Sequence, residues 1–360
     1  MGLMDFIWRL LRKSRKSLKQ KVESQKFKVE SKSAPNHFKL LAFSLQSEFM
    51  KPLLILILIL LSIHSLAQEF KPYDQSIPGT SITFKLAAIP AGNFIIGSHV
   101  SERGRDEDEG PQPEIKVSAF WMGTKEVTFA EWDLYFKDVT LPQAKNLDGV
   151  TRATPQYIDL TWGMGRDGRH PTNSMSHAAA MMYCKWLYSK TGIFFRLPTE
   201  AEWEYACRGG STTAYPFGDD PSPLKEYGYF KENSSNKYHH VSQLKPNGWG
   251  LYDMLGNLSE WTIDQYDPAY YSKISNQDPK TIPASKYPKT VKGGSYLSES
   301  KELRCANRIA SDASWNKRDP QIPKSKWWLT DGMFVGFRVV RPLTQPSEEE
   351  IEKFFALYLK

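Results

Sequence analysis

Residues 250–261 read GLYDMLGNLSEW, a run in which aromatic, glycine and acidic residues stand too densely for an ordinary strand or helix. Asp253 and Glu260 are seven residues apart, and Gly256 breaks the run between them. A hard cation such as Ca2+ takes several oxygen ligands, some from carboxylates and some from backbone carbonyls. A loop that is broken by glycine and has a carboxylate at each end can supply both kinds. The spacing alone nevertheless favours a buried turn with two solvated acids, so the metal interpretation needs support from the rest of the chain.

Further short motifs follow one another along the chain. They are IPAGNF at 89–94 with Gly97-Ser98, KEVT at 125–128, RLPTEAEWEYA at 196–206, KGGS at 292–295 and VGFR at 335–338. Together with residues 250–261 they resemble, in order, the motifs of the sulfatase-modifying-factor superfamily, whose type member is the formylglycine-generating enzyme. The resemblance covers about residues 80–342. It implies an α+β fold of the formylglycine-generating-enzyme type, which is C-type-lectin-like and has little regular secondary structure.

The basic charge of the chain is concentrated at its start. Residues 1–49 contain eleven Lys or Arg and four Asp or Glu, a net charge of +7, which equals the net charge of the whole chain. The remaining residues are therefore neutral overall and lack the basic footprint that phosphate binding needs, which argues against a nucleic-acid partner. We expect residues 1–49 to be a disordered basic leader or to lie outside the true start of the protein.

An apolar run follows this leader. Met50-Lys51-Pro52 precedes nine aliphatic residues at 53–61, and Ser65-Leu66-Ala67 then matches a small-residue cleavage site. Residues 50–67 are predicted to be a secretory signal peptide, because the run is short for a transmembrane helix of about 20 apolar residues. If the leader is part of the protein, the run instead acts as a signal anchor that holds the chain at a membrane. Either interpretation predicts export to the periplasm, the cell envelope or the medium.

Capping boxes mark three helix starts, because a Ser or Thr side chain and a Glu three residues later bond to each other's backbone N–H. The boxes are Thr128–Glu131, Thr199–Glu202 and Ser347–Glu350. A further helix is predicted from about Ser176 to Lys190 and ends at Gly192, and residues 343–360 are predicted to form a short C-terminal helix. Residues 262–330 show few helical or alternating patterns and are predicted to be long loops.

The chain has three cysteines, Cys184, Cys207 and Cys305. An odd number in an exported chain predicts one disulfide and one thiol left over. The family resemblance implies that Cys207, after the EYA motif, pairs with Cys305, after the GGS motif. It also matches Cys184 to one half of a second family disulfide, but Val339 occupies the other half. Cys184 is therefore expected to be a buried free thiol that packs as a small apolar residue.

The segment after GGS departs from the family's catalytic pattern. Formylglycine-generating enzymes hold copper with two thiolates, which are soft ligands that suit Cu(I). The first thiolate position matches Ser298, and the second falls on Ser300 or Leu303, depending on the register. A serine hydroxyl cannot replace a copper thiolate, so copper binding and the known oxidation are not expected. The catalytic residues are left unassigned, with Ser295 and Ser298 as candidates in the cleft.

The resemblance supports the metal loop better than it supports the copper site. It implies Ca2+ ligands from the side chains of Asp253 and Glu260 and from the backbone carbonyls of Gly256 and Leu258. The expected role of this calcium ion is structural, since a shell of hard oxygen ligands leaves no open position.

Two other features are expected to have structural or solvated roles. Iron-dependent relatives use an H-x3-H-x-E set, and His99, His170, His177, His239 and His240 do not have that spacing. His170 precedes Pro171 at the family's HP turn, and the sequential pair His239-His240 is expected to point in different directions. The acidic run SERGRDEDE at 101–109 is predicted to be a solvated hairpin tip close to the family's cleft.

These observations favour an exported, non-oxidising member of the superfamily whose cleft binds a protein or a glycan. A second hypothesis is an oxidoreductase of the formylglycine-generating or non-heme iron kind that acts on a peptide or small thiol through an unrecognised centre. A third is a purely structural envelope protein. Copper binding and peptide-cysteine oxidation distinguish the second hypothesis from the others.

Overall fold

The computed structural model describes residues 70–138, 156 and 158–359. The predicted leader and signal peptide, residues 1–67, lie outside these residues. Among the described helices, none combines the length and the apolar character that crossing a bilayer requires. The 343–360 helix prediction lies within the described part except for its last residue.

The four predicted helices are present in the structure. They are α3 (Phe129–Phe136), α4 (His177–Thr191), α5 (Glu200–Arg208) and α6 (Glu348–Tyr358). Capping boxes begin α3, α5 and α6 at the predicted residues, and Gly192 ends α4 in the left-handed conformation. The predictions from capping and from the terminal glycine are confirmed, because these signals act within a few residues of the chain.

In the described part of the chain, ten short strands form three sheets. The strands are β1 (Tyr73–Ser76), β2 (Thr83–Ile89), β3 (Gly92–Ile95), β4 (Glu114–Val117), β5 (Phe120–Gly123), β6 (Ser259–Gln265), β7 (Lys289–Lys292), β8 (Ile309–Ala310), β9 (Val335–Gly336) and β10 (Val340–Pro342). Their orders are β1-β2-β5-β10, β3-β4 and β8-β7-β6-β9. Only the β6–β9 pair among them is parallel. Five 3-10 turns complete the described elements, at Glu107–Glu109, Ser222–Glu226, Tyr270–Ser272, Ser300–Leu303 and Ala313–Asn316.

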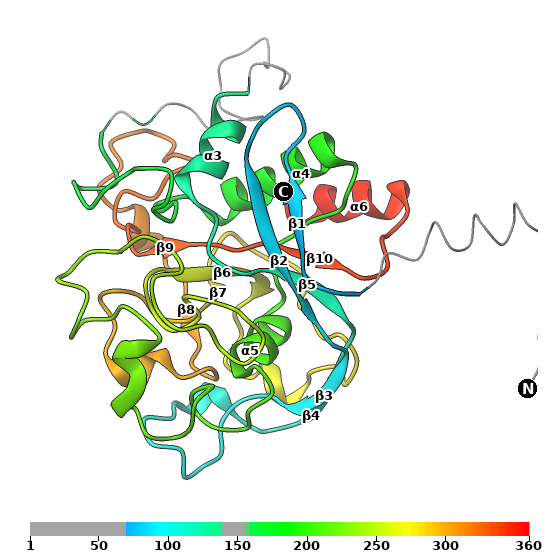
Figure 1. The fold of residues 1–360 in the computed structure, drawn as a ribbon, viewed down its shortest axis with the longest axis vertical. Helices are drawn as coiled ribbons and strands as arrows, with labels where there is room; N and C mark the ends of the chain where they lie inside the picture. The colour runs from blue at the N-terminus through cyan, green and yellow to red at the C-terminus, as the bar shows by residue number, and fades with distance from the viewer. Residues whose placement is uncertain (1–69, 139–155, 157, 360) are drawn as a thin grey trace, which may run out of the picture. The chain divides into compact units, whose positions relative to one another are not determined.

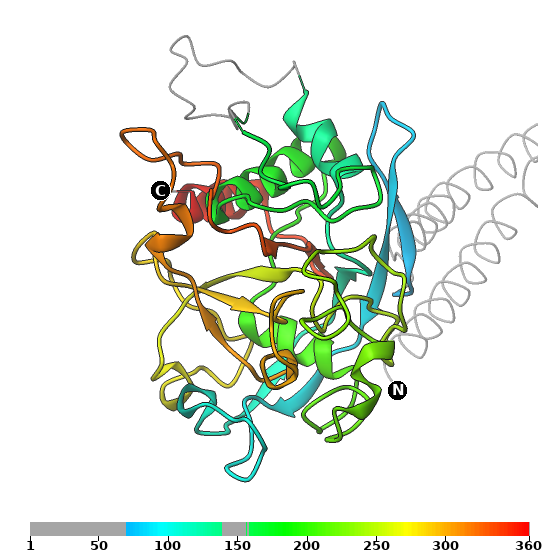
Figure 2. The same ribbon diagram turned by 90° about the vertical axis from the view of Figure 1, so that its left-hand side faces the viewer.

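The β8-β7-β6-β9 sheet lies between two groups of helices. In both views α4 and α6 lie side by side on one side of it, and α5 lies on the other (Figures 1 and 2). Strands β7 and β8 fall within residues 262–330, so the prediction of loops for that whole range was wrong. The four residues of β7 are all buried, including Lys289 and Lys292. Because polar and apolar residues do not alternate with exposure in this strand, the sequence lacks the period-two pattern from which strands are predicted.

The core has two main parts, one on each side of this sheet. One part packs aromatic residues of α3 and α4 against Trp261, Trp328 and Phe337. The other packs α5 against strands β2, β4 and β5 and against the side chains of Leu251, Met254 and Leu255. The family motif at residues 250–261 therefore enters the core directly before β6.

Glycines in the motif allow two backbone segments to touch. A Cβ atom on Gly256 would lie 2.2 Å from the carbonyl oxygen of Tyr229, and one on Gly228 would lie 1.6 Å from that of Leu255. Gly256 also has a φ of 100°, which favours glycine. The motif is therefore fixed against residues 228–229 by direct backbone contact.

Candidate functional site

Glu260, a predicted calcium ligand, lies in strand β6 and is paired with Arg338. Its Oε1 accepts a hydrogen bond of 2.6 Å from Arg338 Nη2, and its Oε2 accepts one of 2.6 Å from Arg338 Nε. The indole Nε1 of Trp203 donates to Oε2 at 2.8 Å. Both side chains of the ion pair are fully buried. Such two-point pairs are among the stronger charged interactions in proteins, so Glu260 is already neutralised by a protein cation.

Asp253, the other predicted carboxylate ligand, has one oxygen available. Its Oδ2 accepts a hydrogen bond of 2.7 Å from the Ser242 amide, but its Oδ1 is buried without a hydrogen-bond partner. Burial raises the pKa of Asp253 to about 6, and the neighbouring Glu260 charge adds to the shift. A buried carboxylate with an unpaired oxygen is a group that a cation would stabilise.

A third carboxylate, which the sequence analysis did not identify, belongs to the same cluster. Glu126 of the KEVT motif is completely buried and accepts hydrogen bonds from the amide of Leu258 at 2.8 Å and from Asn257 Nδ2 at 2.7 Å. Burial raises its pKa, and Asp253 and Glu260 raise it further. The cluster thus sets three buried carboxylates against the one guanidinium of Arg338.

The four predicted calcium ligands therefore fit a cation in part. Asp253 offers a free oxygen inside an acidic cluster, whereas Glu260 would have to share its oxygens with Arg338. The two other predicted ligands are the carbonyl oxygens of Gly256 and Leu258, and the backbone that carries them is fixed by its amides, which donate to the Gly293 carbonyl at 2.9 Å and to Glu126 at 2.8 Å.

Ser295 and Ser298, the candidate catalytic residues, lie together in one turn. The amide of Ser295 donates to Ser298 Oγ at 3.1 Å, and the amide of Leu297 donates to Ser295 Oγ at 3.2 Å. The carbonyl of Ser298 accepts from the Lys231 amide at 3.0 Å. Both hydroxyls accordingly serve the backbone of their own turn. The segment after GGS contributes Glu299, Ser300 and Lys301 to the lining of the cleft that is described below. Ser295 and Ser298 are not among the lining residues in the part of the chain that the structure describes.

The cysteines are arranged as predicted. Cys207 at the end of α5 forms a disulfide with Cys305, with their Cα atoms 5.7 Å apart. Cys184 is a free thiol buried in α4, and burial raises its pKa well above the usual range. A buried thiol that stays protonated is a poor metal ligand and nucleophile.

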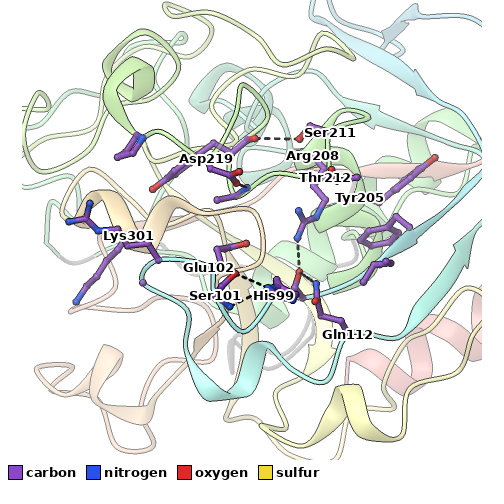
Figure 3. A pocket seen from close by; sticks show the side chains of 18 of the residues that line it. His99, Ser101, Glu102, Gln112, Tyr205, Arg208, Ser211, Thr212, Asp219 and Lys301 are labelled. Atoms are coloured by element: carbon purple, nitrogen blue, oxygen red, sulfur yellow. Dashed lines mark hydrogen bonds between the residues drawn. The ribbon is translucent and has the colours of Figure 1, made fainter.

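A cleft of about 1110 Å³ opens between strand β3, the end of α5 and the segment that follows GGS (Figure 3). One wall is aromatic. The ring of Tyr205 lies 5.1 Å from that of Phe94 and 4.8 Å from that of Trp249, measured between centroids. Tyr205 is held by its hydroxyl, which donates to the Pro90 carbonyl at 3.2 Å. This wall presents the partly exposed rings of Phe94 and Trp249, which pack on the buried ring of Tyr205.

The opposite wall carries charges of both signs. It includes Glu102, Arg103 and Lys301, and Figure 3 shows His99, Glu102 and Arg208 between Tyr205 on one side of the view and Lys301 on the other. Arg208 is fixed by Glu204 at 2.8 Å and by the carbonyl of Gly97 at 2.7 Å. The cleft therefore joins an aromatic face to a polar face in which Arg208 and Glu102 are held in place by hydrogen bonds and ion pairs.

The acidic run at 101–109 was predicted to be a solvated tip, and the structure corrects this prediction at Glu102 and Glu109, whereas Arg103, Asp106 and Glu107 are exposed. Glu109 is completely buried, where it pairs with Arg304 at 2.6 Å and accepts from Ser98 Oγ at 2.6 Å. Glu102 pairs with the same guanidinium at 2.8 Å. Sequence reasoning missed this pairing because Arg304 lies about two hundred residues away, and the run alone carries no sign of it.

Comparisons with known proteins identify the family. The family model described as sulfatase-modifying factor enzyme 1-like domain matches residues 80–343. The formylglycine-generating enzyme of Bos taurus is 29% identical over 280 residues, covering 65% of this chain and 72% of that protein. A second Bos taurus protein, named inactive C-alpha-formylglycine-generating enzyme 2, is 29% identical over 236 residues, covering 53% of this chain and 74% of that protein.

A solved structure agrees on the fold. PvdO from Pseudomonas aeruginosa superposes with a TM-score of 0.60 at 24% identity, covering 77% of this chain and all of that one. The structure, the ordered motifs and the family model agree over the same residues. The chain belongs to the sulfatase-modifying factor enzyme 1-like domain family and has the fold of the formylglycine-generating enzyme.

Proposed function

We propose that this protein is an exported, non-oxidising member of its family that uses the cleft to bind a protein or a glycan. The observation that carries the proposal is the state of its cysteines. The whole chain has three, of which Cys207 and Cys305 are joined and Cys184 is buried. No pair of accessible thiolates is left to hold Cu(I).

The serines that stand at the family's copper positions do not restore this chemistry. A hydroxyl is a neutral, hard ligand, whereas Cu(I) prefers soft thiolates. Ser298 Oγ also accepts a backbone hydrogen bond in its own turn. A nucleophilic role would need a positioned base, and the hydrogen bonds described for Ser295 and Ser298 involve backbone amides. The bovine relative that is named inactive is a precedent for a family member without the activity.

The walls of the cleft support binding of an extended ligand. Partly exposed rings such as Phe94 and Trp249 offer flat apolar faces, on which either a sugar ring or a peptide side chain can stack. The charged side chains of Glu102, Arg103 and Lys301 on the opposite wall can hydrogen-bond to hydroxyls or to a peptide backbone. This combination is typical of sites that bind a ligand.

Export is supported by the predicted signal peptide at 50–67 and by the disulfide, since disulfides persist in oxidising compartments. We further propose that a structural Ca2+ ion binds at Asp253, Gly256, Leu258 and Glu260. The unpaired Oδ1 of Asp253 and the excess of buried carboxylates support this. The ion would balance the cluster and join the motif to strand β6.

Metal content of the full-length protein tests the proposal. The protein is loaded with Ca2+ or with Cu(I), freed of excess metal, and analysed by elemental mass spectrometry beside an Asp253→Ala variant. We expect one equivalent of calcium in the wild type, less in the variant, and no stoichiometric copper in either. One equivalent of copper or iron, with oxidation of a cysteine-containing peptide, would overturn the non-oxidising assignment in favour of an oxidoreductase.

Ligand binding is tested separately with glycan and peptide arrays. Trp249→Ala is expected to abolish retention of the ligand that the wild type selects. Trp162→Ala is the matched control, because Trp162 is an exposed tryptophan that does not line the cleft. Equal retention by the wild type and the Trp249 variant would contradict a binding role for the cleft.

A further inference from the structure

A group of two histidines and one aspartate lies outside the cleft and outside the motif loop. Within residues 70–138, 156 and 158–359, the group Asp167, His170 and His240 brings one donor atom of each side chain within 4.8 Å of the others. His240 Nε2 lies 2.8 Å from Asp167 Oδ2, and His170 Nδ1 lies 3.3 Å from Asp167 Oδ1. The imidazole centroids of the two histidines are 4.1 Å apart.

The backbone holds the three residues together independently of their side chains. The His170 amide donates to the Asp167 carbonyl at 3.0 Å, which closes a turn. The amide of Val241, next to His240, donates to the Arg169 carbonyl at 3.0 Å, and the His170 carbonyl accepts from the Phe129 amide at 3.0 Å. The turn is thus anchored to the start of α3, and the loop that carries His240 is anchored to the turn.

His170 has an unused donor atom that faces this group. Its Nδ1 is buried and makes no hydrogen bond, although it lies within ion-pair distance of Asp167. The His170 ring packs closely against Gly165, where an added Cβ atom would lie only 2.5 Å from it, and this contact limits rotation of the ring. An imidazole nitrogen without a hydrogen-bond partner can offer its lone pair to a metal ion.

The charges favour a cation at this place. Asp167 Oδ1 accepts a hydrogen bond from the Arg169 amide at 2.9 Å, and Asp167 Oδ2 lies 2.8 Å from His240 Nε2, contacts that favour the charged carboxylate. Arg166 precedes Asp167 in the chain, but its guanidinium donates to the Asp133 carboxylate at 2.8 Å and 3.2 Å. The positive charge of Arg166 is therefore balanced by Asp133. The side chain of Asp167 is 53% exposed, and those of His170 and His240 are 15% and 21% exposed. A hydrated cation can therefore reach the donors from solvent.

We propose that Asp167, His170 and His240 bind a divalent transition-metal ion, with Zn2+ as the best match. Two imidazoles and one carboxylate suit Zn2+, whereas Ca2+ and Mg2+ prefer sites made of oxygen alone. Zinc ligands in tetrahedral sites stand roughly 3.3 Å apart at bond lengths of about 2.0 Å, which the present spacing approaches. Three protein ligands leave one position for water.

The metal would connect two loops that support the family motif. The loop with His240 already bonds to that motif, through the Ser242 amide to Asp253 Oδ2 at 2.7 Å and the His239 amide to Asn257 Oδ1 at 2.8 Å. Binding at His240 and Asp167 would tie this loop to the turn before α3. We therefore assign the site a clamping role that does not rest on the proposed function of the cleft.

The test is a Co2+ titration of the full-length protein after treatment with a chelator, followed by displacement with Zn2+. The wild type is expected to bind one equivalent with the visible absorption of a nitrogen- and oxygen-ligated Co2+ ion. His240→Ala and Asp167→Asn are expected to bind at least about tenfold more weakly. Excess Ca2+ should not displace the Co2+, which separates this site from the Asp253 loop.

His239→Ala is the matched control. His239 adjoins His240 in the chain, but its Nε2 pairs with the Ser234 carbonyl at 2.8 Å and its ring stacks on Tyr229. This variant should bind Co2+ as the wild type does. Circular dichroism in chelator verifies that each variant is folded. Unchanged affinity in folded His240→Ala, or no binding to the wild type, would overturn the proposal and leave Asp167 and His240 as an ordinary hydrogen-bonded pair.

Discussion

The helical side and the cleft side of this molecule are held together by different interactions. Around α3 and α4, the indole of Trp132 lies within 6.0 Å of the rings of Tyr135, Tyr183, Trp328 and Phe337. We call this set the aromatic region. Around the cleft, buried guanidinium–carboxylate pairs dominate, namely Arg208–Glu204, Arg304–Glu109 and Arg308–Glu200. We call these pairs the ion-pair region.

The difference follows from how each region satisfies its backbone. Helices α3 and α4 bond their own carbonyl groups, so apolar rings can cover them. The loops around the cleft have few such bonds, and arginines provide them. Arg304 donates to the carbonyl of Lys301, and Arg308 donates to those of Asp108 and Asp267. A guanidinium has five N–H donors, so one buried arginine can fix several loop carbonyls and still pair with a carboxylate.

The largest expected effect is in the aromatic region. Trp132→Ala should lower the free energy of unfolding by about 4 kcal/mol, because it removes a buried indole and leaves a cavity among four rings. Chemical denaturation measures the loss, with Trp132→Phe as the milder control. Ligand binding in the cleft should remain unchanged in the folded fraction. An effect on ligand affinity as large as the effect on stability would show that the two regions are not separate.

A smaller loss is expected in the ion-pair region. Glu109→Ala leaves Arg304 buried without its main partner, which typically costs about 3–5 kcal/mol. Because Glu102 still pairs with Arg304 at 2.8 Å, we expect the lower end of this range. Unlike Trp132→Ala, this change should also weaken ligand binding, since residues 101–104 line the cleft. Glu109→Gln keeps an acceptor and is the control. Unaltered binding by Glu109→Ala would contradict the link between this pair and the cleft wall.

The smallest expected effect concerns the acidic cluster of Asp253, Glu126 and Glu260, and here the substitution is expected to stabilise the fold. The pKa of Asp253 is about 6 in the fold against a usual 3.8. An acid with a raised pKa binds more protons in the folded state, so the free energy of unfolding falls as the pH rises through roughly 4 to 6. In chelator at pH 7.5, Asp253→Asn should therefore be more stable than the wild type by on the order of 1 kcal/mol.

Denaturation curves at pH 3.5 and 7.5 test this sign. The difference between Asp253→Asn and the wild type should shrink at the lower pH, where the wild-type carboxyl is protonated in both states. Asp74→Asn, on the exposed face of strand β1, is the control and should show little change. If Asp253→Asn is destabilising at pH 7.5, the carboxylate is compensated by a partner beyond the Ser242 amide.

The local features of the fold could be predicted from the sequence, whereas the long-range pairings could not. The Thr199–Glu202 box and the Gly192 end act over a few residues, and the family motifs imply the rest of the architecture and the Cys207–Cys305 bridge. The partner of Glu260 could not be predicted in this way. Arg338 stands in the VGFR motif seventy-eight residues later, and only the parallel pairing of β6 with β9 brings the two together.

The candidate site was predicted less well for the same reason. Asp253 was identified from the motif, but Glu126 was not, because one buried glutamate in KEVT has no pattern of its own. His170 was assigned to the family's HP turn, and His239 and His240 were expected to point in different directions. The proximity of His170 and His240 to each other and to Asp167 depends on loop packing, which neither periodicity nor spacing in the sequence reports.

The close approach of Gly228 to the Leu255 carbonyl and of Gly256 to the Tyr229 carbonyl bears on how the sequences of related proteins can change. A side chain at either glycine would collide with the backbone of the opposite segment. Because the obstacle is backbone, a smaller side chain nearby cannot compensate for a substitution of either glycine. The need for glycine at these two positions does not depend on which ligand binds in the cleft or on which residue occupies position 298. A database search guided by the GLYDM motif will therefore retrieve proteins that share this scaffold, and their chemistry has to be established from the residues after GGS.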